Sequence, residues 1–459
     1  MAQPPIASSP PTPWQPGQTI DLAVESLSNS GDGIGRWQER VVFVPNTVPG
    51  DQHKVKLIKL KPNYAVGKSV ALMEPSPHRI RPACIVADKC GGCQWQAVDY
   101  AQQLIAKQQQ VADALARIGG FNDLTLDPIL AAEPLSYRNK ATYPLARSQQ
   151  GTLKAGYYRA GTHQIVNLNQ CPIQDDRLDP LLAGIKQSIQ ANSWSIYNEE
   201  RHRGRLRHLA LRVGHHTGEC LVTLVSTSPI TGLEDAAQQW LETYPGLVGV
   251  CLNLNSDKTN VVFGQETRCV AGQAYLTENF LGLQLRIGPT TFFQVNTAQA
   301  ERLVQVILDE LALTPTDTVV DAYCGIGTLT LPLARQAGYG IGLESQAAAI
   351  EQARHNTALN QIKSVDFRVG PVETQLAEAA NAADVVVLDP PRKGCAPAVL
   401  TALLAAKPAR IAYMSCNPTT LARDLKILCN DGGYRLTRVQ PADFFPQTAH
   451  VECVAFLVA

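Results

Sequence analysis

The chain has 459 residues, of which 45% are apolar and 17% charged, as is ordinary for a globular protein of several domains. The chain has 40 Lys and Arg residues and 40 Asp and Glu residues, so its net charge gives no indication of a nucleic-acid partner. Any basic surface that binds nucleic acid must therefore be local. No apolar run approaches the roughly 18 residues of a membrane span, and the Pro-, Gln- and Ser-rich start lacks the basic and apolar parts of a secretory signal. We therefore expect a cytoplasmic protein with no membrane partner, whose 12 cysteines serve as packed thiols, metal ligands or nucleophiles.

Short β segments dominate residues 15–74, after a tail, residues 1–14, that we expect to be disordered. These segments are β-branched and aliphatic, with Gly, Pro and Asn turns between them: Thr19–Val24, Arg40–Val44, Gln52–Leu60 and Tyr64–Leu72. Strands of this length and spacing predict a small OB-like barrel. A two-residue alternation places Lys54 and Lys56 on one face, which is either an ordinary solvated surface or a platform for single-stranded RNA.

Residues 75–285 mix α and β patterns and hold two clusters of interest. Cys84, Cys90 and Cys93 precede a helical stretch from about Tyr100 to Ile118. Further along, arginines alternate with other residues, so a strand here would carry four of them on one side: Arg201, Arg203, Arg205 and Arg207. Basic side chains also protect exposed edge strands, but a cluster this dense in a neutral protein favours a phosphate-contacting surface.

From residue 286 to 459, short apolar runs alternate with helical stretches. The runs are Thr318–Asp321, Gly340–Glu344, Val365–Val369, Asp384–Leu388 and Arg410–Met414, with helices such as Leu329–Ala337 and Ala347–Asn360 between them. This alternation predicts a doubly wound, mostly parallel sheet. The predicted fold class is multidomain α/β, with an N-terminal barrel, an α+β central domain and a C-terminal Rossmann-like domain.

A Gly-rich turn after the first strand of this last domain predicts a nucleotide-like ligand. Gly325 and Gly327 let the backbone approach a ligand closely, and Glu344 ends the next strand, where an acid can bind both ribose hydroxyls. Thr330 stands where a dinucleotide-binding loop carries its third glycine, which argues against a pyrophosphate. An adenosine ligand without phosphates fits better, and S-adenosylmethionine is the common one.

Two further loops follow strands whose carboxyl ends should meet the same crevice. Asp389 and Cys416 each come directly after a strand, so we expect them to be neighbours. Carbon 5 of uracil is a poor nucleophile until a thiolate adds to carbon 6, and after methylation a base must remove the proton on carbon 5. Cys416 and Glu452 match these two needs. The target uracil must leave its stack, and Phe292 or Phe444 could stack on it or belong to the core.

Five motifs resemble those of the RNA 5-methyluridine methyltransferases. They are Phe292-Phe293-Gln294-Val295-Asn296, Asp321-Ala322-Tyr323-Cys324-Gly325-Ile326-Gly327, Asp389-Pro390-Pro391-Arg392, Ser415-Cys416-Asn417-Pro418 and His450-Val451-Glu452. The resemblance implies S-adenosylmethionine as methyl donor, Cys416 as nucleophile and Glu452 as base. It also implies a set of residues that contact the donor: Gln294, Tyr323, Glu344 and Asp389. The stretch Gly370–Glu373 departs from the Asn or Asp that some members place near the adenine, so no residue is carried over there.

The N-terminal barrel resembles the RNA-binding TRAM domain that many members carry. Members with iron–sulfur clusters have Cys-x5-Cys-Gly-Gly-Cys and a distant Cys-Pro, which match Cys84, Cys90, Cys93 and Cys171. Four thiolates suit a [4Fe–4S] cluster or zinc, and the resemblance favours the cluster. The predicted division is therefore a tail (1–14), a TRAM-like barrel (15–74), a central domain with the cluster (75–285) and a methyltransferase domain (286–459).

The sequence thus predicts methylation of carbon 5 of a uridine in structured RNA by a monomer. The resemblance favours 23S rRNA over tRNA, because cluster-bearing members mostly act on large-subunit ribosomal RNA. An RNA cytosine-C5 methyltransferase usually carries a cysteine where Pro391 stands, and a methyltransferase of exocyclic amines usually carries an aromatic residue where Arg392 stands. A non-catalytic RNA-binding assembly factor, the remaining alternative, would function without Cys416.

Overall fold

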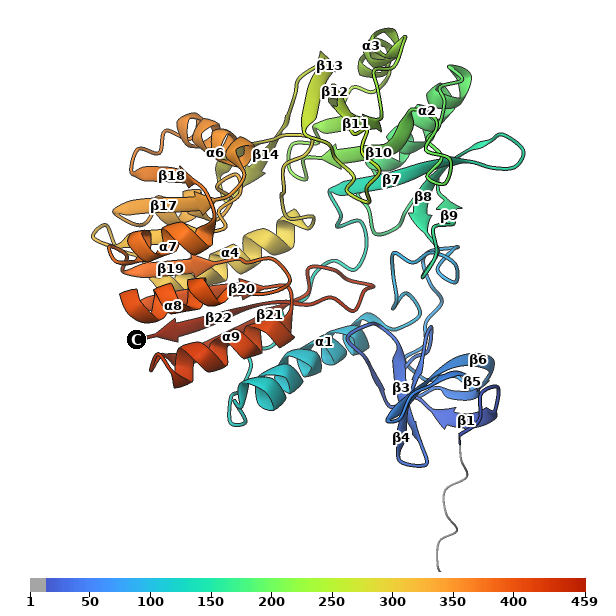
Figure 1. Cartoon of the computed structure of the whole chain (residues 1–459), viewed down its shortest axis with the longest axis horizontal. Coiled ribbons are helices and arrows are strands. Elements are labelled where there is room, and N and C mark those ends of the chain that lie inside the picture. Colours follow the sequence, from blue (N-terminus) through green and yellow to red (C-terminus); the bar gives the residue numbers. More distant parts are fainter. Residues whose placement is uncertain (1–13) are drawn as a thin grey trace, which may run out of the picture. The chain divides into compact units, whose positions relative to one another are not determined.

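The computed structural model describes residues 14–459 (Figure 1). These residues form two compact units. The first comprises residues up to 88, 93–106 and 447–449, and the second comprises 89–92, 107–446 and 450–459. The tail expected at residues 1–14 lies outside the described residues, apart from Trp14. No helix within the described part is long and apolar enough to cross a membrane.

The first unit contains a six-stranded sheet that closes into a small barrel. Its strands are β1 (Thr19–Ala23), β2 (Ser26–Leu27), β3 (Gly33–Trp37), β4 (Arg40–Val44), β5 (Gln52–Leu60) and β6 (Tyr64–Glu74). In the order β1-β5-β6-β4-β3-β2, the first and last strands are consecutive in the chain and belong to one segment, residues 19–27. The two edges of the sheet therefore meet, which closes the barrel. Along β5, Val55 and Leu57 fill the interior while Lys54 and Lys56 are exposed, as the alternation predicts.

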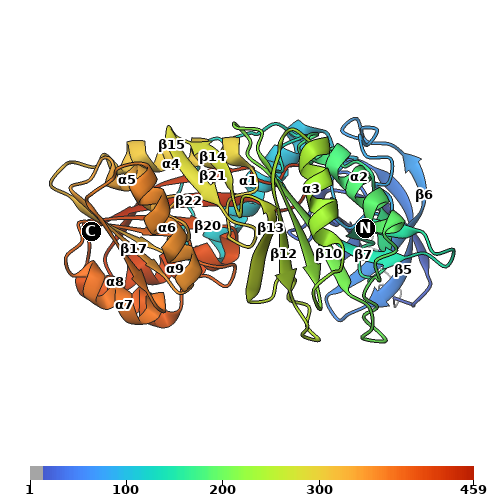
Figure 2. The ribbon, with the colours of Figure 1, turned by 90° about the horizontal axis from the view of Figure 1, so that it is seen from above.

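The second unit begins with helices and a central seven-stranded sheet in the order β13-β12-β11-β10-β7-β8-β9. The helix α1 (Tyr100–Ala114), which starts in the first unit, and the π-helix η1 (Leu115–Gly119) confirm the expected helical stretch. The strands are β7 (Lys140–Arg147), β8 (Leu153–Tyr158), β9 (Ile165–Asn167), β10 (Leu206–Val213), β11 (Cys220–Ser226), β12 (Leu247–Leu254) and β13 (Glu266–Gly272). One helix, α2 (Leu178–Ala191), packs on β8 and β10, and another, α3 (Leu233–Thr243), packs on β12 and β13 (Figure 2).

The arginine cluster differs from the sequence-based expectation. Gly204 has a φ of 102° and helps to turn the chain before β10 begins, so three of the arginines precede the strand: Arg201, Arg203 and Arg205. Arg207 is buried and donates hydrogen bonds of 2.8–2.9 Å to three carbonyl oxygens of residues 255–259. Arg207 therefore holds a loop. The four arginines do not share one strand, and the phosphate-contacting surface stays a prediction for Arg201, Arg203 and Arg205.

The rest of the second unit is a seven-stranded sheet in the order β18-β17-β16-β19-β20-β22-β21, preceded by a hairpin of β14 (Leu276–Phe280) and β15 (Leu283–Ile287). Its strands are β16 (Thr318–Ala322), β17 (Tyr339–Glu344), β18 (Val365–Val369), β19 (Val385–Leu388), β20 (Arg410–Ser415), β21 (Arg435–Ala442) and β22 (Glu452–Val458). Its helices are α4 (Thr297–Leu311), α5 (Thr330–Ala334), α6 (Ala347–Leu359), α7 (Val372–Ala380), α8 (Pro397–Ala406) and α9 (Pro418–Asn430). The strands from β16 to β20 are parallel, and β22 is antiparallel to both of its neighbours.

Each face of this sheet has its own apolar core. Along β19, Val385 and Val387 join the core that includes α4, α5 and α6, whereas Val386 and Leu388 join the core that includes α7, α8 and α9. A strand buried on both faces needs a continuous apolar run, which is why these strands are recognisable in the sequence. The predicted doubly wound, mostly parallel sheet is confirmed, although α5 is shorter than expected.

Candidate active site

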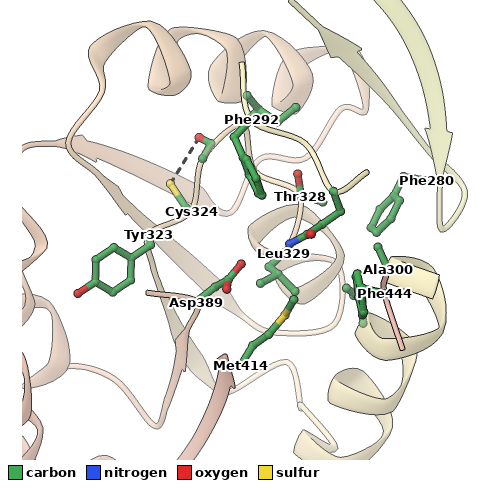
Figure 3. A pocket seen from close by; sticks show the side chains of 14 residues that line it. Phe280, Phe292, Ala300, Tyr323, Cys324, Thr328, Leu329, Asp389, Met414 and Phe444 are labelled. Atoms are coloured by element: carbon green, nitrogen blue, oxygen red, sulfur yellow. Dashed lines mark hydrogen bonds between the residues drawn. The ribbon is translucent and has the colours of Figure 1, made fainter. Parts of the chain in front are cut away.

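A cavity opens at the carboxyl ends of β16, β19 and β20. It contains about 490 Å³ of space outside the protein atoms, part of it open to solvent. Phe280 and Leu329 contribute to its apolar walls (Figure 3). Three of the four residues predicted to contact a methyl donor line it as well: Gln294, Tyr323 and Asp389.

The Gly-rich turn after β16 forms one wall of this cavity. Gly325 and Gly327 adopt φ values of 54° and 89°, in the left-handed region that favours glycine. Tyr323 has a φ of 74°, which is uncommon for a residue with a side chain and is typical of strained backbone at ligand sites. Its ring points away from the other labelled side chains of the cavity (Figure 3).

Buried carboxyl groups lie beside the same turn. Asp321, which the sequence analysis did not select, is 1% exposed, and Thr330 Oγ1 donates to its Oδ2 at 2.5 Å. Its Oδ1 has no hydrogen-bond partner within residues 14–459. Burial raises the pKa of Asp321 to about 7, and burial followed by the charge of Asp321 raises the pKa of Asp389 to about 7. The position of Asp321, directly before a Gly-rich turn, is the sequence signal that would have identified it.

Glu344 is the one predicted donor-contacting residue that does not line the cavity. It is half-buried at the end of β17, and its Oε1 accepts hydrogen bonds from Ser345 Oγ at 3.0 Å and Gln346 N at 2.9 Å. Its charge contributes to the raised pKa of Asp321, so the two carboxyl groups lie within electrostatic reach of each other.

Strand pairing brings Cys416 and Glu452 together. Ser415 pairs with Cys453 in the antiparallel register of β20 and β22, so Cys416 and Glu452 are the next residues at the same edge. Burial, and then the charge of Glu452, raise the pKa of Cys416 to about 11. Burial, and then the charge of Asp389, raise the pKa of Glu452 well above its usual value. The predicted nucleophile, the predicted base and Asp389 therefore form one electrostatic cluster.

Side-chain alternation explains why this cluster faces the cavity. Residues two positions apart on a strand share a face. Each polar group of the site lies two positions from a residue that is buried in the core beside α4 to α6. These buried residues are Val319, Val387, Met414 and Val454. The groups placed on that face are Asp321, Asp389, Cys416 and Glu452. Met414 itself lines the cavity.

Arg392 supplies a cation to this cluster. It hydrogen-bonds to Cys416 and lowers the pKa of that thiol, against the larger effect of burial. Arg392 Nη2 also donates to His450 Nδ1 at 2.6 Å. Burial, and then the charge of Arg392, lower the pKa of His450 to about 4, so the ring is neutral and accepts this bond. Both residues stand in sequence motifs that by themselves predict no role for them.

Two other thiols lie on loops of the same crevice, Cys324 and Cys395. Each is 4% exposed. Burial raises the pKa of Cys324 well above its usual value and that of Cys395 to about 12. Cys416 is only half-buried and is the most accessible thiol of the three.

The four cysteines of the expected cluster are divided between the two units. Cys84 and Cys93 belong to the first, and Cys90 and Cys171 belong to the second. No three His, Cys, Asp or Glu side chains are grouped as metal ligands in the part of the chain that the structure describes. The sulfur of Cys90 accepts a hydrogen bond from Gly92 N at 3.4 Å. The cluster therefore stays a prediction.

A family model described as tRNA (uracil-5-)-methyltransferase matches residues 99–459, well over half of the chain. The chain belongs to this family. A TRAM domain model matches residues 13–70. The protein is thus an RNA methyltransferase with an N-terminal TRAM domain and a C-terminal methyltransferase fold, as the sequence analysis predicts.

Relatives and a solved structure agree with this assignment. An uncharacterised RNA methyltransferase of Nostoc sp. is 59% identical over 447 residues, and one of Synechocystis sp. is 52% identical over 448 residues, each match covering 97% of both chains. The structure of Pyrococcus abyssi tRNA (uracil-54, C5)-methyltransferase in complex with S-adenosyl-L-homocysteine matches with a TM-score of 0.77 at 28% identity. That match covers 95% of this chain and 99% of the Pyrococcus chain.

Proposed function

We propose that the enzyme transfers a methyl group from S-adenosylmethionine to carbon 5 of a uridine in structured RNA. The observation that carries this proposal is the grouping of Cys416, Glu452 and Asp389 at one edge of the sheet, beside the cavity. A soft nucleophile, a carboxylate base and a methyl donor are the components that this reaction requires.

The residues around the cavity fit the proposed donor. Its apolar walls suit an adenosine. Asp321, whose buried Oδ1 has no hydrogen-bond partner within the described residues, lies within electrostatic reach of the cavity residue Asp389 and favours a positively charged ligand. We assign donor contacts to Gln294, Tyr323, Asp389 and Glu344. When bound, the donor supplies an electrophilic methyl group on a sulfonium.

Two residues of the chain carry out the other steps of the reaction. The thiolate of Cys416 adds to carbon 6 of the uracil, and the resulting enolate makes carbon 5 nucleophilic enough to take the methyl group. Glu452 then accepts the proton from carbon 5, the electron pair restores the double bond between carbons 5 and 6, and the Cys416 thiolate leaves. The raised pKa of Glu452 makes its carboxylate a stronger base than an exposed glutamate.

Arg392 is proposed to help Cys416 ionise. A thiol with a pKa of about 11 is ionised to only roughly three parts in ten thousand at pH 7.5. The hydrogen bond from Arg392 stabilises negative charge on the sulfur as it forms. His450 holds the guanidinium in place, because its neutral ring accepts one of the guanidinium donors.

Phe292 is proposed to stack on the uracil once the base has left its stack. Its side chain is 69% exposed at the cavity, whereas Phe444 is fully buried and serves the core. An exposed aromatic ring offers a stacking surface for any unpaired base. Phe444 also lines the cavity, but its full burial favours a core role.

The proposed target is 23S rRNA, with tRNA as the second candidate. The resemblance to cluster-bearing members favours the first, and the tRNA (uracil-54, C5)-methyltransferase of Pyrococcus abyssi favours the second. We expect the enzyme to act as a monomer in the cytoplasm. Mass-spectrometric mapping of 5-methyluridine in both RNAs from a deletion strain will show which RNA loses the mark.

A [4Fe–4S] cluster held by Cys84, Cys90, Cys93 and Cys171 is part of the proposal. Four thiols are a suitable donor set, and hydrogen bonds to thiolate sulfurs of the kind that Cys90 accepts tune such clusters. Protein purified without oxygen is expected to be brown and to contain iron and sulfide. A colourless protein with bound zinc would refute the cluster.

The covalent step provides the decisive test of the proposed function. RNA transcribed with 5-fluorouridine cannot lose a proton from carbon 5, so the wild-type enzyme and donor should form an adduct that survives denaturing gels. Cys416→Ala should form none, whereas Cys324→Ala and Cys395→Ala should retain it. Equal adduct with Cys416→Ala would refute the role of Cys416, and the absence of methyl transfer by the wild type would favour an assembly factor.

A further inference from the structure

Two cations lie directly opposite each other on the central sheet. Lys140 of β7 and Arg212 of β10 are partners in the antiparallel register, so their side chains leave the sheet on the same face. Like charges in this arrangement destabilise a pair of strands. The charge that shifts the pKa of Lys140 is that of Arg212, and it disfavours the charged ammonium. The sheet therefore places two positive charges side by side, and they repel each other.

Arg212 is the more deeply buried of the two. Its side chain is 4% exposed, and its Nη2 donates to the carbonyl oxygen of Thr291 at 2.7 Å. Its Nε lacks a hydrogen-bond partner within the described residues. An arginine stays charged at every relevant pH, and buried charges are normally paired. An anion is the partner that would complete this site.

Lys140 makes the pair approachable, because its side chain is only partly buried. Its Nζ lies 5.4 Å from the centre of the Phe263 ring, a cation–π contact that attracts the ammonium but does not neutralise it. Burial, and then the charge of Arg212, lower the pKa of Lys140 to about 7. A bound anion would relieve the repulsion that disfavours its charged form.

The pair also lies next to the segment that serves the active site. Arg212 holds the carbonyl of Thr291, and the following residue, Phe292, lines the donor cavity. Asn139, the neighbour of Lys140, donates through Nδ2 to the carbonyl oxygen of Gln294 at 2.8 Å. A ligand at the two cations and a base at Phe292 could therefore belong to one polymer.

We propose that Lys140 and Arg212 bind a backbone phosphate of the RNA next to the target uridine. The identity of this anion rests on the proposed function. The guanidinium offers its open Nε to a phosphate oxygen, and the ammonium adds a point charge. Holding the flanking phosphate fixes the strand where the uridine must leave its stack, which helps to offset the cost of unstacking.

The test is the salt dependence of RNA binding by full-length variants. The probes are unmodified transcripts of 23S rRNA and of tRNA, and affinity is measured by filter binding across a salt series. Lys140→Met should weaken binding and reduce the slope of log affinity against log salt by about 1. Lys140→Arg should restore most of that slope. Lys363→Met is the matched control, because Lys363 is exposed and precedes β18, at the edge of its sheet opposite the cavity.

The outcomes separate this inference from the proposed function. A wild-type slope in Lys140→Met, or an equal loss in Lys363→Met, would overturn the phosphate site even if the enzyme methylates uridine. A slope reduced in Lys140→Met but not in Lys363→Met would support it even if no methyl transfer occurred. Arg212→Met should act in the same direction, and thermal unfolding together with the affinity for S-adenosylhomocysteine will show that Lys140→Met leaves the fold and the donor site intact.

Discussion

Binding of S-adenosylmethionine should release protons from the active site, whereas binding of S-adenosylhomocysteine should not. Asp389 lines the donor cavity with a pKa of about 7, so about half of the molecules carry its proton at pH 7. A positive charge about 5 Å away interacts with a carboxylate by about 3 kcal/mol at an effective dielectric constant near 20. This interaction lowers a pKa by about 2 units, which brings the proton occupancy at pH 7 close to zero.

The expected release at pH 7 is therefore about half a proton from Asp389 and up to as much again from Asp321, whose pKa is also about 7. Because the bound state has the lower carboxyl pKa, affinity for the sulfonium ligand should rise with pH between about 5 and 7 and then level off. Isothermal titration calorimetry in two buffers of different ionisation enthalpy measures the protons directly. Equal proton counts for the sulfonium and thioether ligands would refute this reasoning, and Asp389→Asn should reduce the difference between them.

Three substitutions test other parts of the site. Glu452→Gln should reduce turnover by about 10²- to 10⁴-fold and accumulate a methylated RNA–protein adduct on denaturing gels; turnover within tenfold of the wild type would contradict its role as base. Phe292→Ala should reduce RNA methylation at low substrate concentration about tenfold through lost stacking, with little change in the unfolding midpoint because the ring is 69% exposed. Lys107→Met should lower the free energy of unfolding by about 3–5 kcal/mol, because it leaves fully buried Asp443 without the ammonium 2.5 Å away. In urea denaturation, Lys107→Met with Asp443→Leu should recover part of that loss, and no recovery would contradict a pairwise role.

Local patterns in the sequence identified those elements whose burial alternates or is continuous. The barrel strand Gln52–Leu60 was found to the residue, because every second side chain enters the interior. The strand Val385–Leu388 was found within one residue, because both of its faces are covered. The position of Asp389 and Cys416 after neighbouring parallel strands was then a consequence of topology, since the carboxyl ends of such strands share one edge.

Features that depend on distant partners were not predictable in this way. The alternation of arginines before β10 imitates a strand, but Gly204 turns the chain and Arg207 bonds to a loop about 50 residues away. Arg392 meets Cys416 and His450 only after folding, so its motif gave no role. The orphaned oxygen of Asp321 is a property of the packed turn and has no counterpart in the sequence.

The position of Glu452 shows most clearly what local patterns leave open. Successive residues of β22 enter the two apolar cores in turn, so both faces of the strand are apolar. Burial of apolar side chains alone would therefore hardly distinguish the observed register of β22 from one shifted by a single residue. Yet such a shift against β20 would turn Glu452 away from Cys416 and put Cys453 in its place. The fully buried ion pair between Lys107 and Asp443 anchors the loop that leads into β22, and Lys107 also bonds to a backbone carbonyl of that loop at 3.0 Å. We infer that this anchor sets the register of the strand, which ties the position of the proposed base to a helix more than 300 residues earlier in the chain.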